Sequence, residues 1–90
     1  MKSDFECHIT MKGDRSSLET LVARLRGNWT FSCIDGDPVL GAHVFCYATN
    51  HFGSELEAKM RTNDATGELI CAGVNPIRAK IEHVVWDLRF

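Results

Sequence analysis

The chain has 90 residues, of which 44% are hydrophobic and 24% charged, a composition typical of a globular protein with one modest core. Its length excludes a separate substrate domain, so we expect residues 1–90 to form one domain. Its formal charge of −2 argues against general nucleic-acid binding. No run approaches the ~20 apolar residues of a membrane span, and no apolar signal region precedes the first predicted strand, so we expect a cytoplasmic protein without membrane contact.

The first predicted element is a strand over residues 5–11, Phe-Glu-Cys-His-Ile-Thr-Met, in which apolar and polar residues alternate strictly. Because successive side chains of a strand point to opposite faces, one face would line a core and the other would carry Glu6, His8 and Thr10. At a rise of ~3.4 Å per residue, these three side chains follow one another at about 7 Å. A turn is predicted at residues 12–15.

A helix and a hairpin follow the first strand. The capping-box pattern of residues 16–19, Ser-Ser-Leu-Glu, predicts the start of a helix, and Gly27 predicts its end. The apolar face of this helix has the spacing i, i+3, i+4 and i+7 and consists of Leu18, Leu21, Val22 and Leu25. Two β-rich runs, residues 29–34 and 42–49, then predict a hairpin whose loop at 35–41 is rich in turn-forming residues.

A second helix and another strand come next along the sequence. Residues 54–57, Ser-Glu-Leu-Glu, repeat the capping-box pattern and predict a helix that reaches about Ala72 and stops at Gly73. Residues 62–67 in its centre are poor helix formers, so we expect a kink or a break there. Residues 77–88 predict the last strand.

The order strand, helix, strand, strand, helix, strand predicts an α+β fold, a ferredoxin-like βαββαβ sandwich. In this arrangement an antiparallel sheet has the strand order 4-1-3-2, the helices cover one face, and the other face is open. With Ile81 and Val85 directed toward the helices, the last strand buries no charged residue, and His83 faces inward. The same register places on the open face Lys80, Glu82, Val84 and Trp86.

The open face receives the candidate functional residues. Its predicted members are Glu6, His8 and Thr10 in the middle, Lys80 and Glu82 beside them, and His43, Phe45, Tyr47 and Thr49 opposite. A histidine among carboxylates and a lysine can serve acid–base chemistry. The same residues also suit cross-strand pairs on a solvated sheet, such as Glu6 with Lys80 and His8 with Glu82.

Three aromatic residues form a candidate apolar patch on this face, namely Phe45, Tyr47 and Trp86. Phe45 and Tyr47 lie two residues apart, as the base-stacking aromatics of RNA-recognition domains do. The basic and glycine pattern of that motif is missing around residues 41–43. We therefore expect these rings to fill a sheet surface or a dimer interface, and RNA binding through Phe45 and Tyr47 ranks third among the functional hypotheses.

The sequence offers no complete metal site. Its cysteines, Cys7, Cys33, Cys46 and Cys71, lack the Cys-x-x-Cys spacing of zinc sites, and we expect them to be buried thiols. Residues 35–37, Asp-Gly-Asp, resemble half of a calcium loop, but no spaced acidic ligands follow them. We expect neither a metal nor a cofactor.

The tripeptide His8-Ile9-Thr10 on a predicted strand resembles the His-x-Thr element of the 2H phosphoesterases, which act on cyclic phosphates and 2′,5′-linked nucleotides. Those enzymes hold two such elements on two pseudo-symmetric ferredoxin-like lobes, where the histidines act as acid and base and the threonines bind phosphate. This chain matches a single lobe, because neither His43-Val44-Phe45 nor His83-Val84-Val85 supplies a second threonine. The resemblance implies a phosphoester site at His8 and Thr10, with a homodimer supplying the second pair.

A broader similarity, over residues 5–10, 34–41 and 45–49, relates the chain to small bacterial and phage proteins of unknown function, which implies an interaction protein of phage type. The leading hypothesis is a small non-catalytic module whose open face, together with the 35–41 loop, binds a protein partner or a second copy, because the catalytic set is incomplete. Its face would comprise Glu6, Phe45, Tyr47, Lys80, Glu82 and Trp86. The alternative is a protein that binds or hydrolyses a nucleotide or another small phosphoester, a phosphodiesterase-like hydrolase with His8 and Thr10 as catalytic residues and Glu6, Lys80 and Tyr47 as supports.

Overall fold

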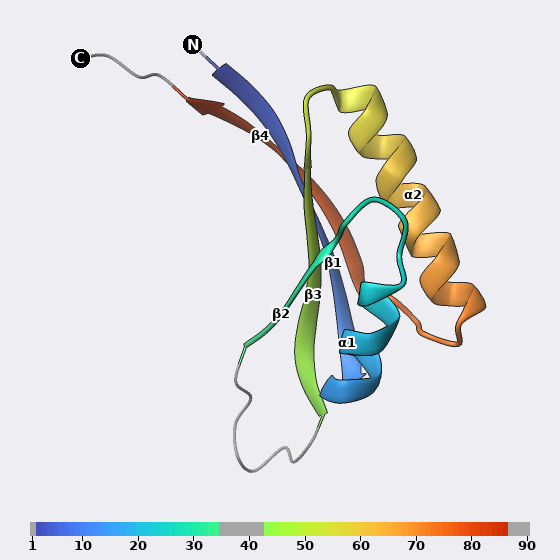
Figure 1. Ribbon diagram of the computed structural model, residues 1–90. Coiled ribbons are helices and arrows are strands. Elements are labelled where there is room, and N and C mark those ends of the chain that lie inside the picture. Colours follow the sequence, from blue (N-terminus) through green and yellow to red (C-terminus); the bar gives the residue numbers. More distant parts are fainter. Residues whose placement is uncertain (1, 35–42, 87–90) are drawn as a thin grey trace.

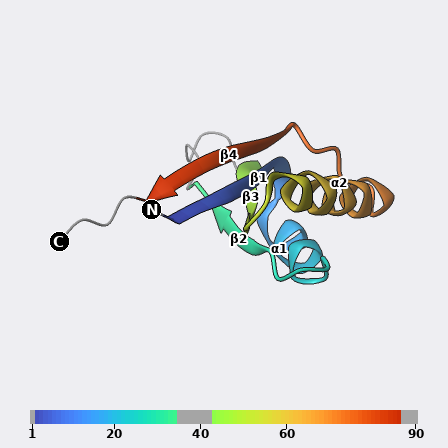
Figure 2. The same cartoon turned by 90° about the horizontal axis from the view of Figure 1, so that it is seen from above.

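A computed structural model describes residues 2–34 and 43–86, and the side chains of residues 4–34 and 45–85. Its elements are, in chain order, β1 (Lys2–Asp14), α1 (Arg15–Ala23), β2 (Thr30–Cys33), β3 (His43–Phe52), α2 (Glu55–Cys71) and β4 (Arg78–Trp86). The strands form one antiparallel sheet in the order β2-β3-β1-β4, and both helices lie on the same side of it (Figures 1 and 2). The predicted ferredoxin-like α+β sandwich is therefore confirmed.

Strand β1 is longer than predicted and leads directly into α1. It continues to Asp14, so the predicted turn at residues 12–15 is wrong. The carboxylate of Asp14 caps the helix, accepting hydrogen bonds from the backbone N–H of Ser17 at 3.0 Å and from Ser17 Oγ at 2.9 Å. Because this carboxylate satisfies a free amide of the first turn, the helix begins at Arg15, ahead of the capping box predicted at residues 16–19.

Helix α1 ends before the predicted stop at Gly27. The chain turns through Gly27 and Asn28, whose φ angles are 98° and 58°, and Asn50 Nδ2 donates a hydrogen bond of 2.6 Å to the carbonyl of Gly27. This turn brings Trp29 over the core, where its ring meets that of Phe52 edge to face at 6.1 Å between centroids. Gly27 therefore shapes the entry into β2, a role that requires its positive φ.

The hairpin strands differ from the prediction in their bounds. Strand β2 is confined to four residues, Thr30–Cys33, whereas β3 continues past the predicted end at residue 49 as far as Phe52. The two strands pair from Thr30 opposite Thr49 to Cys33 opposite Cys46. The predicted loop at residues 35–41 lies outside the described residues.

Helix α2 is continuous, so the kink or break predicted at residues 62–67 is wrong (Figure 1). Its start is as predicted, because the Ser54 hydroxyl accepts a hydrogen bond from the backbone N–H of Glu57 at 3.2 Å. The helix buries one stripe of residues against the sheet, consisting of Ala58, Thr62, Ala65 and Leu69. Burial of this stripe outweighs the low helix propensity of the central residues, which costs at most about 1 kcal/mol each.

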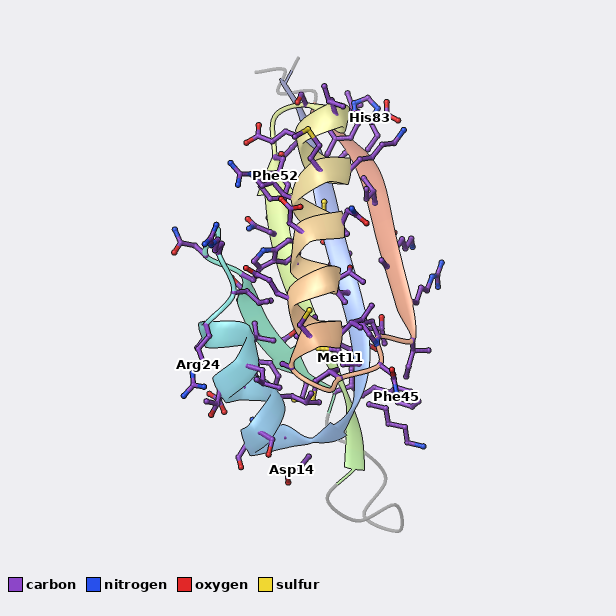
Figure 3. The ribbon with its side chains drawn as sticks, turned by 90° about the vertical axis from the view of Figure 1, so that its right-hand side faces the viewer. Met11, Asp14, Arg24, Phe45, Phe52 and His83 are labelled. Carbon is purple, nitrogen blue, oxygen red and sulfur yellow. The ribbon has the colours of Figure 1, made fainter. Side chains whose placement is uncertain are left out.

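Strand β4 has the predicted register. Ile81 lies opposite Cys7, on the helix side and against the core. His83 is also on the helix side, but it is exposed and stacks on Phe5 with ring centroids 4.6 Å apart (Figure 3). Val85 is likewise half exposed. Helix α2 begins at Glu55, beside this end of the sheet, and does not cover the end of β4. Residues 87 and 88 of the predicted strand lie outside the described residues.

The core lies between the sheet and the two helices. Its buried members are Cys7, Ile9, Met11, Leu18, Val22, Leu25, Trp29, Cys46, Ala48, Ala58, Ala65 and Leu69. The apolar side of the β1 alternation thus forms the centre of the core, and its polar side is turned to the opposite face of the sheet. Within residues 2–34 and 43–86, no helix combines the length and the apolar character needed to cross a membrane.

Candidate functional site

We call the side of the sheet opposite α1 and α2 the open face (Figure 2). Strand alternation and register place on it Asp4, Glu6, His8, Thr10 and Lys12 of β1, Thr30 and Ser32 of β2, Phe45, Tyr47, Thr49 and His51 of β3, and Arg78, Lys80, Glu82 and Val84 of β4. The predicted residues Glu6, His8, Thr10, Phe45, Tyr47, Lys80 and Glu82 therefore share one surface. His43 and Trp86 belong to β3 and β4, but their side chains are outside the described part of the chain.

His8 is held by two side chains, one on its own strand and one on the neighbouring strand. Its Nε2 lies 2.5 Å from Oε1 of Glu6, and its Nδ1 lies 3.0 Å from Oγ1 of Thr49. In the neutral ring, Nε2–H donates to the carboxylate and Nδ1 accepts from the hydroxyl; in the protonated ring, both nitrogens donate. Thr49 serves either state, because a hydroxyl group both donates and accepts. Both ring nitrogens of His8 are thus engaged within the protein, and the hydroxyl bonded to it is that of Thr49 rather than Thr10.

Two further charge pairs lie beside His8. The Nδ1 atom of His51 is 3.0 Å from Oδ2 of Asp4, and the ammonium group of Lys80 contacts the Glu82 carboxylate. The hydrogen bond and the charge of Lys80 lower the pKa of Glu82 below its ordinary value. The three carboxylates of the open face, those of Asp4, Glu6 and Glu82, therefore each have a basic partner on that face.

The cross-strand pairs predicted for this face are wrong. The register places Glu6 opposite Glu82 and His8 opposite Lys80, whereas Glu6 with Lys80 and His8 with Glu82 were predicted. Each carboxylate instead pairs with the basic side chain two residues away on its own strand, Glu6 with His8 and Glu82 with Lys80. Glu6 and Glu82 thus face each other across the strands, where like charges are unfavourable, and each has a basic partner on its own strand.

The end of the open face nearest the β1–α1 junction is basic and aromatic. Thr10 lies between its register partners, Tyr47 of β3 and Arg78 of β4. The next β1 residue on this face is Lys12, whose Nζ lies 5.9 Å from the centroid of the Phe45 ring, at the outer range of a cation–π contact. Two cations, Lys12 and Arg78, and two aromatic rings, Tyr47 and Phe45, therefore lie near the Thr10 hydroxyl group.

Four ionisable residues of the open face were missed by sequence reasoning: Asp4, Lys12, His51 and Arg78. The period of two that identified the first strand would have found Asp4 and Lys12 if the strand had been extended at both ends. The same extension of β3 would have added His51, and Arg78 follows from the register already predicted for the last strand at residues 77–88. Their signal was present in the sequence, but strand ends are the least certain part of a prediction from alternation.

The four described cavities lie away from the open face. Four cavities of about 290 to 380 Å³ lie against the helices, and none of these four is lined by an open-face residue. Among the described residues, no group of three or more histidine, cysteine, aspartate or glutamate side chains is placed to hold a metal ion. The chemistry of the open face is that of a polar sheet with aromatic residues at one end.

Comparison with known proteins gives no family or functional assignment, because no protein-family model, curated protein or solved structure matches the chain.

Proposed function

We propose that this chain is a small non-catalytic binding module whose open face engages a partner protein or a second copy of the chain. The observation that carries this proposal is the internal pairing of the three carboxylates on that face, Glu6 with His8, Asp4 with His51 and Glu82 with Lys80. An acid–base catalyst needs a ring nitrogen directed at a bound substrate. Both nitrogens of His8 have protein partners instead, and no cavity described at the site brings a substrate to them.

The composition and size of the open face suit a protein interface. Phe45 is 45% exposed beside the half-buried Tyr47, and the polar residues Thr10 and Lys12 are their register partners on β1. Interfaces combine aromatic anchors with a polar surround. The strands contain 13, 4, 10 and 9 residues, which at ~3.4 Å per residue and ~4.8 Å between strands give a face of about 600 Å². This area is comparable to the ~800 Å² per partner of a standard interface.

The test compares two charged substitutions on opposite sides of the protein. Phe45→Asp changes the open face, and Leu56→Asp changes an exposed apolar residue of α2 that is 70% exposed. Sedimentation over a range of concentrations measures self-association, and affinity capture from the native organism followed by purified-component binding measures a partner. We expect the wild type and Leu56→Asp to associate and Phe45→Asp to lose at least tenfold in affinity.

A concentration-independent monomer that retains no partner would refute the proposal. So would an equal loss in both variants, because the open face would then have no special role. Folding of each variant is checked by far-ultraviolet circular dichroism, so that a loss of structure is not mistaken for a lost contact.

We propose binding of a small phosphoester as the second candidate function, supported by the cations Lys12 and Arg78 on either side of Thr10. A phosphate group near Thr10 would meet a hydroxyl donor and two positive charges, and Tyr47 could stack on a nucleobase. This arrangement also corresponds to the His-x-Thr resemblance, in which the threonine binds phosphate and His8 acts on it.

A thermal-shift panel of inorganic phosphate and of cyclic and linear nucleotides tests this candidate. A ligand bound only by the folded state at a hundred times its Kd adds about 2.7 kcal/mol of stability. We expect stabilisation of the wild type and of Lys59→Ala, a cation on α2, but not of Arg78→Ala. Hydrolysis that His8→Ala abolishes would identify a catalyst, and a panel without any shift would remove the phosphoester function.

A further inference from the structure

Two cysteines lie directly opposite each other in the hairpin. Cys33 of β2 and Cys46 of β3 are register partners. The backbone N–H of Ile34 donates to the carbonyl of Phe45 at 3.2 Å, which makes Cys33 and Cys46 a non-hydrogen-bonded pair of the antiparallel ladder. In such a pair the Cα atoms are about 4.5 Å apart, within the ~4.4–6.8 Å that disulfide bonds span.

The two sulfur atoms are already in contact. Their Sγ atoms lie 2.7 Å apart, with one thiol donating to the other, and both cysteines are present as thiols. Cys46 is completely buried on the helix side of the sheet, whereas Cys33 is partly exposed. The other two cysteines are in different settings, Cys7 buried beneath α2 and Cys71 exposed at the end of that helix.

We propose that Cys33 and Cys46 form a modification site, a thiol pair that a low-molecular-weight disulfide such as oxidised glutathione converts to a cross-strand disulfide bond. This inference is independent of the proposed function. In the first step, the Cys33 thiolate attacks one sulfur of the disulfide, forming a mixed disulfide on Cys33 and releasing one thiolate. In the second step, Cys46 sulfur attacks Cys33 Sγ, and the second small thiolate leaves with the proton of Cys46. Two protein thiols thus lose two electrons and two protons, and one small disulfide is reduced to two thiols.

The environments of the two thiols indicate that Cys33 reacts first with the small disulfide and Cys46 second. Burial, together with the hydrogen bond to Cys33, raises the pKa of Cys46 to about 12, so this thiol is a poor first nucleophile. Cys33 is accessible to a small disulfide from solvent. Once the mixed disulfide has formed, Cys46 needs no solvent access, because its sulfur is already in contact with Cys33 Sγ.

The bond would secure the shortest strand of the sheet. It would close a loop from residue 33 to residue 46 and tie the four-residue edge strand β2 to β3. Closing a loop of ~15 residues raises the unfolding temperature of a small domain by on the order of 10 °C. Phe45 and Tyr47, which flank Cys46, would then be carried on a cross-linked hairpin.

Peptide mapping tests the proposal directly. Trypsin cleavage after Arg26 and Lys59 yields one peptide, residues 27–59, that contains Cys33 and Cys46 and no other cysteine. After incubation of the folded Cys71→Ser variant with oxidised glutathione, we expect this peptide to lose the mass of two hydrogen atoms and to resist alkylation until it is reduced. Cys46→Ser should instead accumulate a glutathione adduct on Cys33, and Cys33→Ser should gain neither modification.

Two results would overturn the proposal. One is a 27–59 peptide that keeps both thiols alkylatable while exposed Cys71 of the wild type is oxidised under the same conditions. The other is a stable glutathione adduct on Cys33 in the presence of Cys46, because a resolving thiol in contact would have displaced it. Both readouts use chains with the Cys33 and Cys46 pair intact, so a folding defect of a serine variant does not affect them.

Discussion

The substitution Thr62→Val is expected to stabilise this protein. Thr62 lies in the middle of α2 and is 4% exposed, and its Oγ1 is completely buried without a hydrogen-bond partner among the described residues. The Thr62 hydroxyl also interacts with the Cys7 thiol, whose pKa burial raises and this interaction lowers in part, but a thiol is a weak hydrogen-bond partner. A buried, unsatisfied hydroxyl group costs about 1–3 kcal/mol.

Valine has the same shape as threonine and a similar helix propensity, so it removes the unsatisfied group without opening a cavity. We therefore expect the free energy of unfolding to rise by about 1–2 kcal/mol. In a domain of ~90 residues each 1 kcal/mol corresponds to about 4–8 °C in the unfolding temperature. Urea denaturation followed by circular dichroism measures the change as a higher midpoint at an unchanged m value.

Thr66→Val is the matched control, the same substitution one turn later in the same helix. Thr66 is only partly buried, and its Oγ1 donates a hydrogen bond of 2.7 Å to the carbonyl of Thr62. Removing that bond gives no stabilisation and costs up to about 1 kcal/mol. A Thr62→Val protein that is less stable than the wild type, or that changes as Thr66→Val does, would refute the assignment of an unsatisfied hydroxyl in the core.

Three further predictions concern the helix cap and the dependence of stability on pH. Asp14→Ala should lower the free energy of unfolding by about 1 kcal/mol, through loss of the N-cap bond, while Ser16→Ala changes it by less than half as much in the same urea assay. Because Lys80 lowers the pKa of Glu82, the contribution of this carboxylate is complete above its ordinary value of 4.5 and is lost as the pH falls through the lowered pKa. Lys80→Met should therefore flatten the acid side of the stability curve, and superimposable wild-type and variant curves would contradict the pairing. Because burial raises the pKa of Cys46 from 9.0 to about 12, its neutral thiol stabilises the fold fully below pH 9.0 and progressively less as the pH rises toward 12. Cys46→Ala should decline less steeply over that range, and an unchanged slope would count against a buried thiol.

The paired side chains and the exposed aromatic ring of the open face are expected to contribute differently to stability and to binding. The pairs lie at the surface, where solvent screens an ion pair and it adds little to stability. Phe45, in contrast, keeps much of its ring in contact with solvent, although Lys12 lies over it. Burying such a ring against a partner removes apolar area from water at about 25 cal/mol per Å². Association is therefore expected to depend on the aromatic end of the face more than on its charges.

Local patterns in the sequence determined the kinds of elements and their order. The alternation of residues 5–11 identified β1 and the side on which His8 lies, and the serine at residue 54 identified the start of α2. The order of elements then predicted the strand order, because short connections and right-handed crossovers leave few topologies. Even the register of β4 followed from the cost of burying a charge next to Ile81.

Only the tertiary structure decided which side chains meet. Thr49, 41 residues from His8, became its hydrogen-bond partner, and the pairing of β2 with β3 brought Cys33 to Cys46. The predicted pairs Glu6 with Lys80 and His8 with Glu82 keep every side chain on its predicted face, but they lie two residues to opposite sides of the observed register, and one antiparallel register cannot contain both. The continuity of α2 was likewise a tertiary result, because burial against the sheet overrode local helix propensity. Faces follow from a period of two along one strand, whereas contacts depend on the register between strands that lie far apart in the chain.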